Sequence, residues 1–326
     1  MAEIGWQGIR LTVPDDWEPG QFSGDFKAGH IRIDSVMTQR AVVRWLPADS
    51  TRDVYRRTKT RTDGVDEILR NYLKAISRAE RKQRHTLKTE SSTRLIPKRR
   101  LGKKAVRFYS WRCEEDGRQG HGLVWYCDSC ERTVIAEVDG EKGENVEAMA
   151  ADVLTTLGDH AEGGQNLWSV FGLSVRVPER FLLSNSTMMG GKVELRLEHG
   201  GEVISLQRWV ANVALAGDDL ETWAKHDILK PMRRSYSFRA RREPVLDHEG
   251  IHVTGYKRGI QNHAAYILGR FIRRERPFFL DGRIWHCPNQ NKLFTVHTLM
   301  KESNRSLVED IIGSSQCGSE SEGDTG

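Results

Sequence analysis

Residues 8–17 have the sequence Gly-Ile-Arg-Leu-Thr-Val-Pro-Asp-Asp-Trp, and residues 172–181 repeat this pattern as Gly-Leu-Ser-Val-Arg-Val-Pro-Glu-Arg-Phe. This similarity is the strongest indication of the fold. Further landmarks recur in the same order and at nearly the same spacing: Pro14 as Pro178, Trp17 as Phe181, Arg44-Trp45 as Arg208-Trp209, and Trp125-Tyr126-Cys127 as Trp285-His286-Cys287. The sequence therefore predicts two copies of one domain, at residues 1–160 and 165–315, with a disordered tail at 316–326.

Composition agrees with this organisation. A length of 326 residues suggests about two domains, and a hydrophobic content of 38% with nine tryptophans is typical of a globular chain. No apolar run reaches the roughly 18–20 residues that cross a bilayer, and no secretory signal is recognisable. Five cysteines are an odd number, which favours a reducing compartment over a disulfide framework. We expect a cytoplasmic protein without a membrane partner.

Local patterns predict an α+β fold, in which helices cover an antiparallel sheet in each copy. Ile9, Leu11 and Val13 alternate with polar residues and end at Pro14, as in a half-buried strand. Similar runs predict strands at 31–33, 41–45, 86–96, 105–113, 123–127 and 132–138, and then at 173–177, 193–197, 203–209, 251–256, 264–271, 283–287 and 293–299. Apolar residues at helical spacing predict helices near 65–76, 145–157, 220–229 and 303–312. Residues 158–165 are predicted as a surface linker.

The order of these elements resembles the PsbP-like fold, which the photosystem II PsbP proteins share with the Ran-binding Mog proteins. The similar features are an opening strand that ends at Val13-Pro-Asp-Asp-Trp17, an early hairpin, a helix in the middle, and a Trp-x-Cys strand pair before the last helix. The resemblance covers both copies. It implies a tandem pair of PsbP-like modules, and members of this family are mostly non-catalytic binding modules.

The pair Cys127-Asp-Ser-Cys130 suggests a zinc knuckle, with Cys113 or His121 completing the four ligands, or a redox pair. A redox Cys-x-x-Cys usually begins a helix, whereas this pair is predicted to flank a two-residue hairpin. The repeat also argues against a metal, because Cys127 recurs as Cys287 while Cys130 is replaced by Gln290. We interpret the shared cysteine as a small buried hydrophobic residue, and expect no metal and no cofactor.

Residues 248–252, His-Glu-Gly-Ile-His, match the zinc-protease motif only in letters. That chemistry needs both histidines on one helix face, and residues 251–256 are predicted to be extended. In a strand, residues four apart are separated by roughly 13 Å, which is too far for one zinc ion. We therefore interpret the match as accidental.

The tryptophans of the repeat could stack on bases or cations, but their recurrence favours a role in the two cores. No nucleophile elbow, phosphate loop or dinucleotide-binding motif is present. Among the remaining histidines, His121 and His263 have the most site-like context, and a surface-loop role is the simpler interpretation of both. The lack of these signatures favours a non-enzymatic protein, with an enzyme of an unrecognised type as an alternative.

Basic residues gather between Lys74 and Lys104, with only Glu80 and Glu90 opposing them, and again at residues 225–242 and 270–276. The candidate partner-binding residues are Arg78, Arg81, Lys82, Arg84, Lys98, Arg99, Arg100, Arg233, Arg234, Arg241 and Arg242. A basic face of this kind suits an acidic protein surface or the phosphates of nucleic acid, while ordinary solvation of charged residues explains the same pattern without a ligand. We expect an interaction or scaffold protein that uses this face or the groove between the copies.

Overall fold

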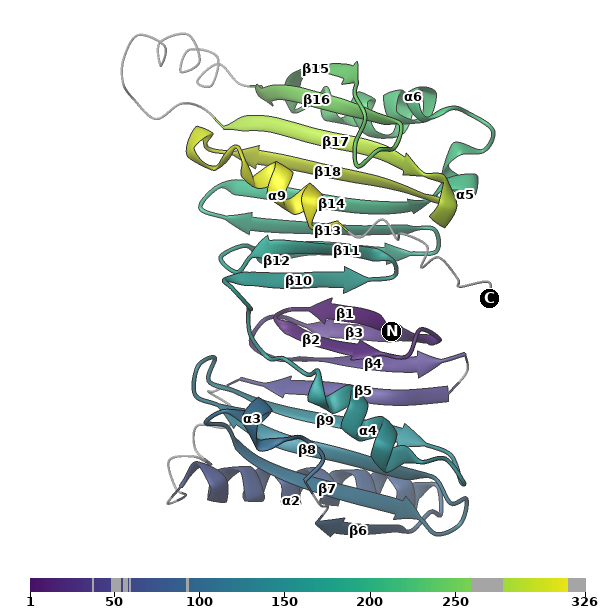
Figure 1. The fold of residues 1–326 in the computed structure, drawn as a ribbon, viewed down its shortest axis with the longest axis vertical. Coiled ribbons are helices and arrows are strands. Elements are labelled where there is room, and N and C mark those ends of the chain that lie inside the picture. The colour runs from purple at the N-terminus through teal and green to yellow at the C-terminus, as the bar shows by residue number, and fades with distance from the viewer. Residues whose placement is uncertain are drawn as a thin grey trace, which may run out of the picture. The chain divides into compact units, whose positions relative to one another are not determined.

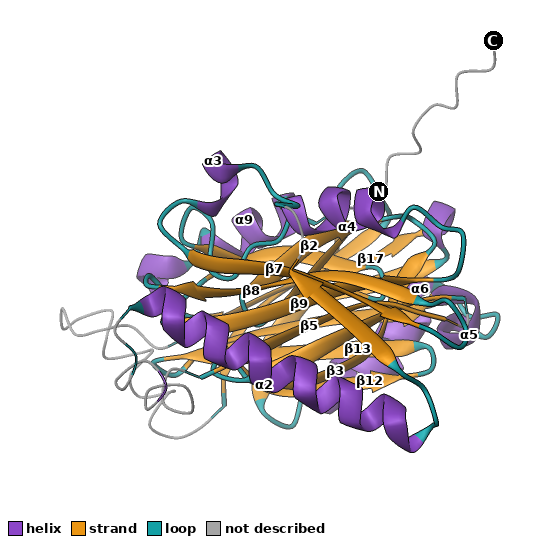
Figure 2. Ribbon diagram, turned by 90° about the horizontal axis from the view of Figure 1, so that it is seen from below, coloured by secondary structure: helices purple, strands orange, loops and turns teal. Residues whose placement is uncertain are grey.

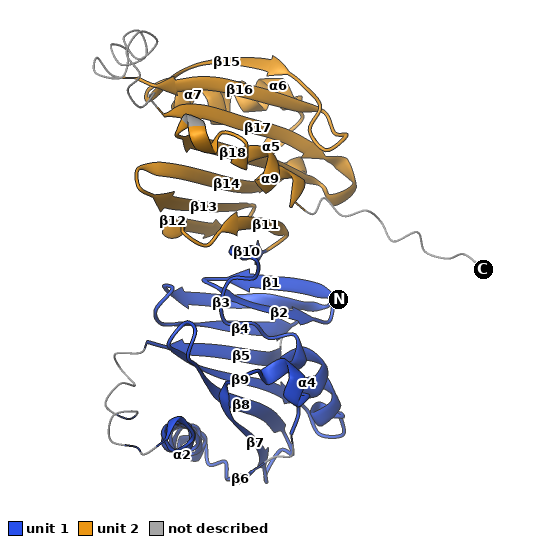
Figure 3. Cartoon of the chain, turned by 60° about the vertical axis from the view of Figure 1, so that its left-hand side comes forward, with its two compact units in different colours: residues 1–170 blue, residues 171–326 orange. Residues whose placement is uncertain are grey.

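The computed structural model describes residues 1–36, 38–47, 54, 58, 60–91, 94–258 and 278–315. The predicted strand at 264–271, His263, the basic run at 270–276 and the tail at 316–326 lie outside the described residues. The chain divides into two compact units, Met1–Val170 and Phe171–Gly326 (Figure 3). The described parts of both units consist mainly of antiparallel sheets with a few helices, which agrees with the predicted α+β class.

Unit 1 is built on a seven-stranded antiparallel sheet with the order β3-β4-β5-β9-β8-β7-β6 (Figure 1). Its elements are β1 (Ala2–Trp6), β2 (Ile9–Val13), β3 (Trp17–Gly24), β4 (Gly29–Ser35), β5 (Thr38–Leu46), α2 (Arg61–Lys82), β6 (Leu87–Ser91), α3 (Lys98–Leu101), β7 (Ala105–Cys113), β8 (Gln119–Cys127), β9 (Arg132–Gly140), α4 (Val146–Thr155) and β10 (Gln165–Val170). The predicted strand at 86–96 is therefore shorter than expected and ends at Ser91.

Two helices cover opposite faces of this sheet (Figure 2). Helix α2 begins at a capping box, in which Thr60 and Asp63 exchange side-chain and backbone hydrogen bonds. Its apolar stripe, which includes Val65 and Ile68, packs on the sheet beside Tyr109. Helix α4 packs against β8 and β9 on the other face. The central strands of the sheet are thus covered on both sides.

Unit 2 has a second seven-stranded antiparallel sheet, with the order β12-β13-β14-β18-β17-β16-β15. Its elements are β11 (Leu173–Pro178), β12 (Leu182–Met189), β13 (Lys192–His199), β14 (Glu202–Val210), α5 (Ala211–Leu215), α6 (Leu220–Trp223), the π-helix η1 (Ala224–Leu229), α7 (Lys230–Met232), β15 (Tyr236–Arg242), β16 (Gly250–Lys257), β17 (Phe279–Cys287), the 3₁₀ turns η2 (Pro288–Gln290) and η3 (Glu302–Asn304), β18 (Lys292–Met300) and α9 (Leu307–Gly313). Taken in chain order, these strands pair as the corresponding strands of unit 1 do.

The segment predicted as a linker, residues 158–165, ends where a strand begins, since it shares only Gln165 with β10. Within unit 1, β10 pairs antiparallel with β1, so that Gly5 lies opposite Ser169. Trp6 and Trp168 pack edge to face with ring centroids 5.4 Å apart, and the Ser169 hydroxyl donates to the Glu3 carbonyl at 2.7 Å. Residues 158–164 form the connection, but they do not all lie at the surface as predicted, because Asp159 is buried and Gly158 pairs with Arg10.

One landmark of the repeat is not equivalent in the two sheets. Trp125 and Trp285 each lie opposite the third residue of the next strand, Val134 and Phe294. Trp45 also lies opposite Val134, whereas Trp209 lies opposite Leu293, one position earlier. A shift of one residue turns a side chain to the other face of a sheet. Trp45, Trp125 and Trp285 are accordingly buried core residues, as predicted, while Trp209 is half-buried against Trp223.

Candidate functional site

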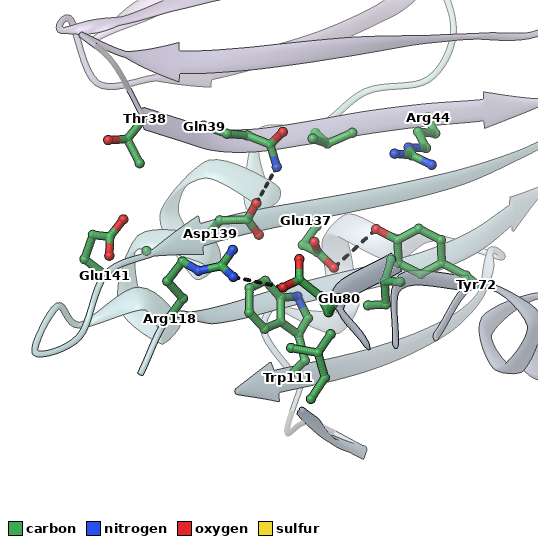
Figure 4. Close-up of a pocket in the computed structure, with 14 residues that line it drawn as sticks. Thr38, Gln39, Arg44, Tyr72, Glu80, Trp111, Arg118, Glu137, Asp139 and Glu141 are labelled. Carbon is green, nitrogen blue, oxygen red and sulfur yellow. Dashed lines mark hydrogen bonds and ion pairs between the residues drawn. The ribbon is translucent and has the colours of Figure 1, made fainter. Parts of the chain in front are cut away.

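A cavity of about 340 Å³ lies between α2 and the sheet of unit 1 (Figure 4). We call it the α2 cavity. Tyr72 and Glu80 line it from the helix, Gln39 and Arg44 from β5, and Glu137 and Asp139 from β9, while Trp111 and Arg118 complete the wall. Its volume is at the lower end of the range of small-molecule sites, about 300–1,000 Å³.

Two carboxyl groups two residues apart on β9 form the floor of the α2 cavity. Tyr109 donates a hydrogen bond of 2.8 Å to Glu137 Oε2, and Tyr72 donates to the same oxygen at 3.4 Å. The Gln39 amide donates to Asp139 Oδ2 at 2.7 Å. Figure 4 shows Glu137 and Asp139 on the same side of β9, facing the helix. Their spacing follows from strand geometry, which turns every second side chain to one face.

Burial dominates the electrostatics of this pair. It raises the pKa of Glu137, although the tyrosine hydroxyls favour the ionised form. Burial, followed by the negative charge of Glu137, raises the pKa of Asp139 well above its ordinary range. Burial and Glu137 likewise raise the pKa of Tyr109. The raised pKa values favour the protonated forms of the pair, and a protonated carboxyl group can donate as well as accept hydrogen bonds.

An ion-pair cluster closes one end of the α2 cavity. The Arg118 guanidinium lies 2.9 Å from Glu80 Oε2 and 2.6 Å from Asp116 Oδ2. His85 Nδ1 lies 2.9 Å from the same Glu80 oxygen. The cluster joins the last turn of α2 to the loop between β7 and β8, and so fixes the distance between helix and sheet at that end.

Unit 2 has a comparable cavity of about 390 Å³, which Asp227, Pro231 and Met232 line opposite the sheet. Its wall contains His297, the sixth residue of β18, just as Glu137 is the sixth residue of β9. His297 is buried, and burial lowers its pKa to about 4. The cavity is thus common to both units, whereas the carboxyl pair belongs to unit 1. Neither polar floor was predicted from the sequence.

The basic residues of unit 1 do not form one face, contrary to the prediction. Arg78, Arg81, Lys82 and Arg84 are exposed at the C-terminal end of α2; we call them the α2 basic end. Lys98, Arg99 and Arg100 form α3, which lies on the other side of the sheet (Figure 2). We call them the α3 triplet.

The two groups also lie near opposite ends of α2, whose 22 residues span about 33 Å. The α3 triplet leads into Ala105, which pairs with Tyr126, and Tyr126 contacts Arg61 at the start of the helix. The α2 basic end is instead followed by Leu87, which pairs with Cys113 at the far end of β7. Neighbours in the sequence are separated because β6 runs antiparallel to β7, from Cys113 toward the end of β7 that α3 precedes.

The basic residues of unit 2 differ in how they are paired. Arg233 and Arg234 are exposed directly after α7, and the Arg233 guanidinium lies over the Phe238 ring. Arg241 lies 2.6 Å from Glu243, and Arg242 pairs with Glu221. Arg241 and Arg242 therefore each have a carboxylate partner within the unit, so that of these four candidate residues Arg233 and Arg234 resemble the α2 basic end.

The predicted burial of the repeated cysteine is confirmed, since Cys127 and Cys287 are both buried. The suggested zinc ligands Cys113 and His121 are wrong, however. His121 precedes Cys127 by six residues on the same strand, about 20 Å, and Cys113 lies beyond Arg112, which pairs with Gln119 at that far end. The turn after Cys127 also has four residues rather than two, because Cys127 pairs with Arg132.

The zinc-protease letters at 248–252 are accidental, as predicted. His252 lies in strand β16, and its Nε2 is 3.0 Å from Asp281 Oδ1 while its Nδ1 is 3.1 Å from Glu243. Arg283 pairs with Asp281 and with Glu309. The histidine is part of a buried polar network that joins β16, β17 and α9.

Comparisons with known proteins give no relative: no family model matches the chain, and no curated protein matches its sequence. Among the described residues, no helix is both long and apolar enough to cross a membrane.

Proposed function

We propose that the chain is a tandem pair of PsbP-like modules that acts as a non-enzymatic interaction protein and binds an acidic segment of a partner protein at the α2 basic end. The shared strand order of the two sheets and the repeated sequence support the duplication. The described cysteines form no disulfide, which fits a chain that acts in a reducing compartment such as the cytoplasm.

One observation carries the proposal: the α2 basic end concentrates positive charge that the molecule does not neutralise. Arg78, Arg81 and Lys82 occupy positions i, i+3 and i+4, so they share one helix face, where like charges repel by about 0.2–0.5 kcal/mol per pair. Within the part of the chain that the structure describes, none of these side chains forms an ion pair with a carboxylate. Favourable interaction with the negative end of the helix dipole offsets part of this cost.

Arg84 adds a cation at a position that favours glycine. It follows the C-cap residue Gln83 and has a left-handed backbone with φ of 66°. The Arg84 N–H donates to the Arg81 carbonyl and the His85 N–H to the Glu80 carbonyl, which is the Schellman arrangement that usually carries glycine. Arg84 thus has a strained backbone at a position that follows Arg78, Arg81 and Lys82 at the end of the helix.

The size and position of the charged groups favour an acidic peptide over nucleic acid. A duplex is bound by many lysines and arginines that follow the phosphates along one surface. Here the seven candidate residues of unit 1 lie in two small groups, at the end of α2 and in α3, and these two helices lie on opposite sides of the sheet. A short acidic segment needs only a compact group of cations.

The test is fluorescence anisotropy with a labelled poly-glutamate peptide and, separately, a labelled DNA duplex. We expect the full chain to bind the peptide, and Arg78→Glu/Arg81→Glu/Lys82→Glu to weaken binding at least about tenfold, or 1.4 kcal/mol. The matched control is Lys98→Glu/Arg99→Glu/Arg100→Glu, which makes the same charge change in the α3 triplet and should leave affinity nearly unchanged after correction for net charge.

Equal losses in both triple variants would show that only the net charge of the chain matters, and would refute the proposal. Binding of the duplex in preference to the peptide, with affinity that falls steeply with salt, would favour the nucleic-acid alternative.

A further inference from the structure

A cluster of metal-binding residue types lies on the other side of the sheet from the α2 cavity. Cys127 ends β8 and Cys130 lies in the turn that follows it, while Asp159 and His160 follow α4. One ligand atom from each of these four residues lies within 4.8 Å of the others. The turn and the segment after α4 are far apart in the sequence, so the spacing of the cysteines alone does not reveal the cluster.

The distances within the cluster are close to those of a tetrahedral site. Cys127 Sγ lies 3.7 Å from His160 Nδ1, and zinc bonds of about 2.3 Å to sulfur and 2.0 Å to nitrogen at tetrahedral angles would place these atoms about 3.5 Å apart. His160 Nδ1 also contacts Asp159 Oδ1 at 2.8 Å. A metal between them would replace this hydrogen bond, and the half-exposed His160 ring can move to allow it.

We propose that Cys127, Cys130, Asp159 and His160 form a structural zinc site in unit 1. Two cysteines, one histidine and one carboxylate are ligands that zinc accepts, and four ligands close a structural site. The site would join the β8–β9 turn to the chain segment between α4 and β10. It lies apart from the α2 basic end, so it does not depend on the proposed function.

The surroundings of Asp159 are arranged as the outer shell of a metal site would be. The Trp125 indole donates to Asp159 Oδ2 at 2.9 Å, which leaves Oδ1 toward the cluster. Lys104 Nζ lies 3.0 Å from Oδ1. Two thiolates and a carboxylate leave one net negative charge around Zn²⁺, and the buried Lys104 ammonium neutralises it. Such outer partners orient the ligands and are nearly as important as the ligands themselves.

Unit 2 provides an internal comparison. Cys287 ends β17 as Cys127 ends β8, but the turn after it runs through Pro288 to Asn291 and contains no second cysteine. The buried cysteine therefore suits the fold without a metal, and Cys130 is the addition that needs explanation. In the sequence, the replacement of Cys130 by Gln290 in the second copy argued against zinc. The sequence alone does not show that Asp159 and His160 lie beside the turn.

The test uses the full chain, reduced, freed of metal with a chelator and titrated with Co²⁺ and then Zn²⁺. We expect one equivalent of Co²⁺ to give the visible absorption of a tetrahedral site and the near-ultraviolet thiolate-to-cobalt band, both lost when Zn²⁺ replaces it. Cys130→Ser and His160→Ala should each weaken Zn²⁺ binding at least about tenfold. Both side chains are partly exposed, so these variants should fold.

The matched control is Cys113→Ala, which removes a thiol from the separate group of His85, Cys113 and Asp116. It should bind zinc as the unchanged chain does. The proposal is overturned if the reduced chain binds no metal, or if Cys130→Ser and His160→Ala bind zinc as tightly as the control.

Discussion

Glu137 and Asp139 are the residues whose surroundings differ most from what a strand usually offers a carboxyl group. Both face α2 in a buried part of the sheet, and both have raised pKa values because burial disfavours the charged form. A carboxyl group whose folded-state pKa is raised stabilises the fold fully at acidic pH. That stability is lost as the pH rises through the raised pKa.

The first prediction concerns Asp139→Asn, which imitates the protonated acid and can still accept from Gln39. We expect it to increase the free energy of unfolding at pH 8 by at least about 1.4 kcal/mol, the equivalent of one pKa unit, and to have little effect at pH 4. Urea denaturation at both pH values measures this. Asp152→Asn, on the exposed side of α4, is the control; a gain at pH 8 that is no larger than the control's would contradict the account.

His297 in unit 2 should show the opposite pH dependence. Its pKa is lowered to about 4 by burial, so the unfolded chain binds a proton between pH 6.5 and 4 that the folded unit does not. Unit 2 should lose stability as the pH falls through that range. His297→Leu should remove the loss, which denaturation curves at pH 5 and 7.5 would reveal. A variant that remains as acid-sensitive as the unchanged chain would show that His297 is not the cause.

At the residue scale, the sequence predicted which hydrophobic residues are buried but not which polar residues gather. Cys127, Cys287, Trp125 and Trp285 were predicted correctly because alternation along a strand is a local property. Glu137 and Asp139 also follow that alternation, beside Ile135, and two acids on the buried side of a strand were a signal that could have been used. The approach of Tyr72 depends on where α2 docks, which no local pattern determines.

At the scale of elements, the end of α2 combines a helix stop with a cluster of cations. Arg84 is the clearest case, because its left-handed backbone costs about 1–2 kcal/mol for a residue with a Cβ, while glycine would lose about 0.5–1 kcal/mol in chain entropy. The proposed role of Arg84 in binding a partner would account for an arginine at this position.

The prediction is that Arg84→Gly stabilises unit 1 by about 0.5 kcal/mol and at the same time weakens binding of the acidic peptide. Thermal unfolding and anisotropy measure the two effects on one sample. Arg78→Gly is the contrasting control, since glycine within a helix costs about 1 kcal/mol and should lower both stability and binding. An Arg84→Gly chain that binds as before would remove Arg84 from the proposed site.

Helices and strands were predicted well where the hydrophobic periodicity is strong. Features that depend on strand register or on the path of a loop were predicted poorly. Helix α2 was expected from its apolar stripe, and the strand pair that carries the two Trp-x-Cys runs was expected from the repeat. The predicted equivalence of Trp45 and Trp209 was wrong. The pairing of β14 with β18 is shifted by one residue relative to that of β5 with β9, and the amino-acid sequence alone does not show such a shift. The single basic face was wrong because α3 crosses to the other side of the sheet.

At the scale of the whole molecule, the boundary between units has a consequence for where the chain can be cut. The sequence placed the end of the first copy at 160, yet residues 165–170 add β10 to β1 within unit 1. A protein that ends at 160 would expose the edge of β1 and remove the Trp168 ring from Trp6, and open strand edges favour association.

We predict that residues 1–170 unfold in one cooperative transition as a monomer, whereas residues 1–160 are less stable and self-associate. Thermal unfolding followed by tryptophan fluorescence, with light scattering for the size, distinguishes the two. Equal stability and size would mean that β10 contributes nothing to unit 1.

We have proposed that a partner's acidic segment binds at the α2 basic end. Hydrogen–deuterium exchange of the full chain, with and without the poly-glutamate peptide, tests the location directly. We predict slower exchange at the C-terminal turns of α2 and at Gln83 to Thr86, with α3 and the sheet of unit 2 unchanged. Slower exchange at α3 instead, or no change in α2 at a peptide concentration that saturates binding, would contradict the claim.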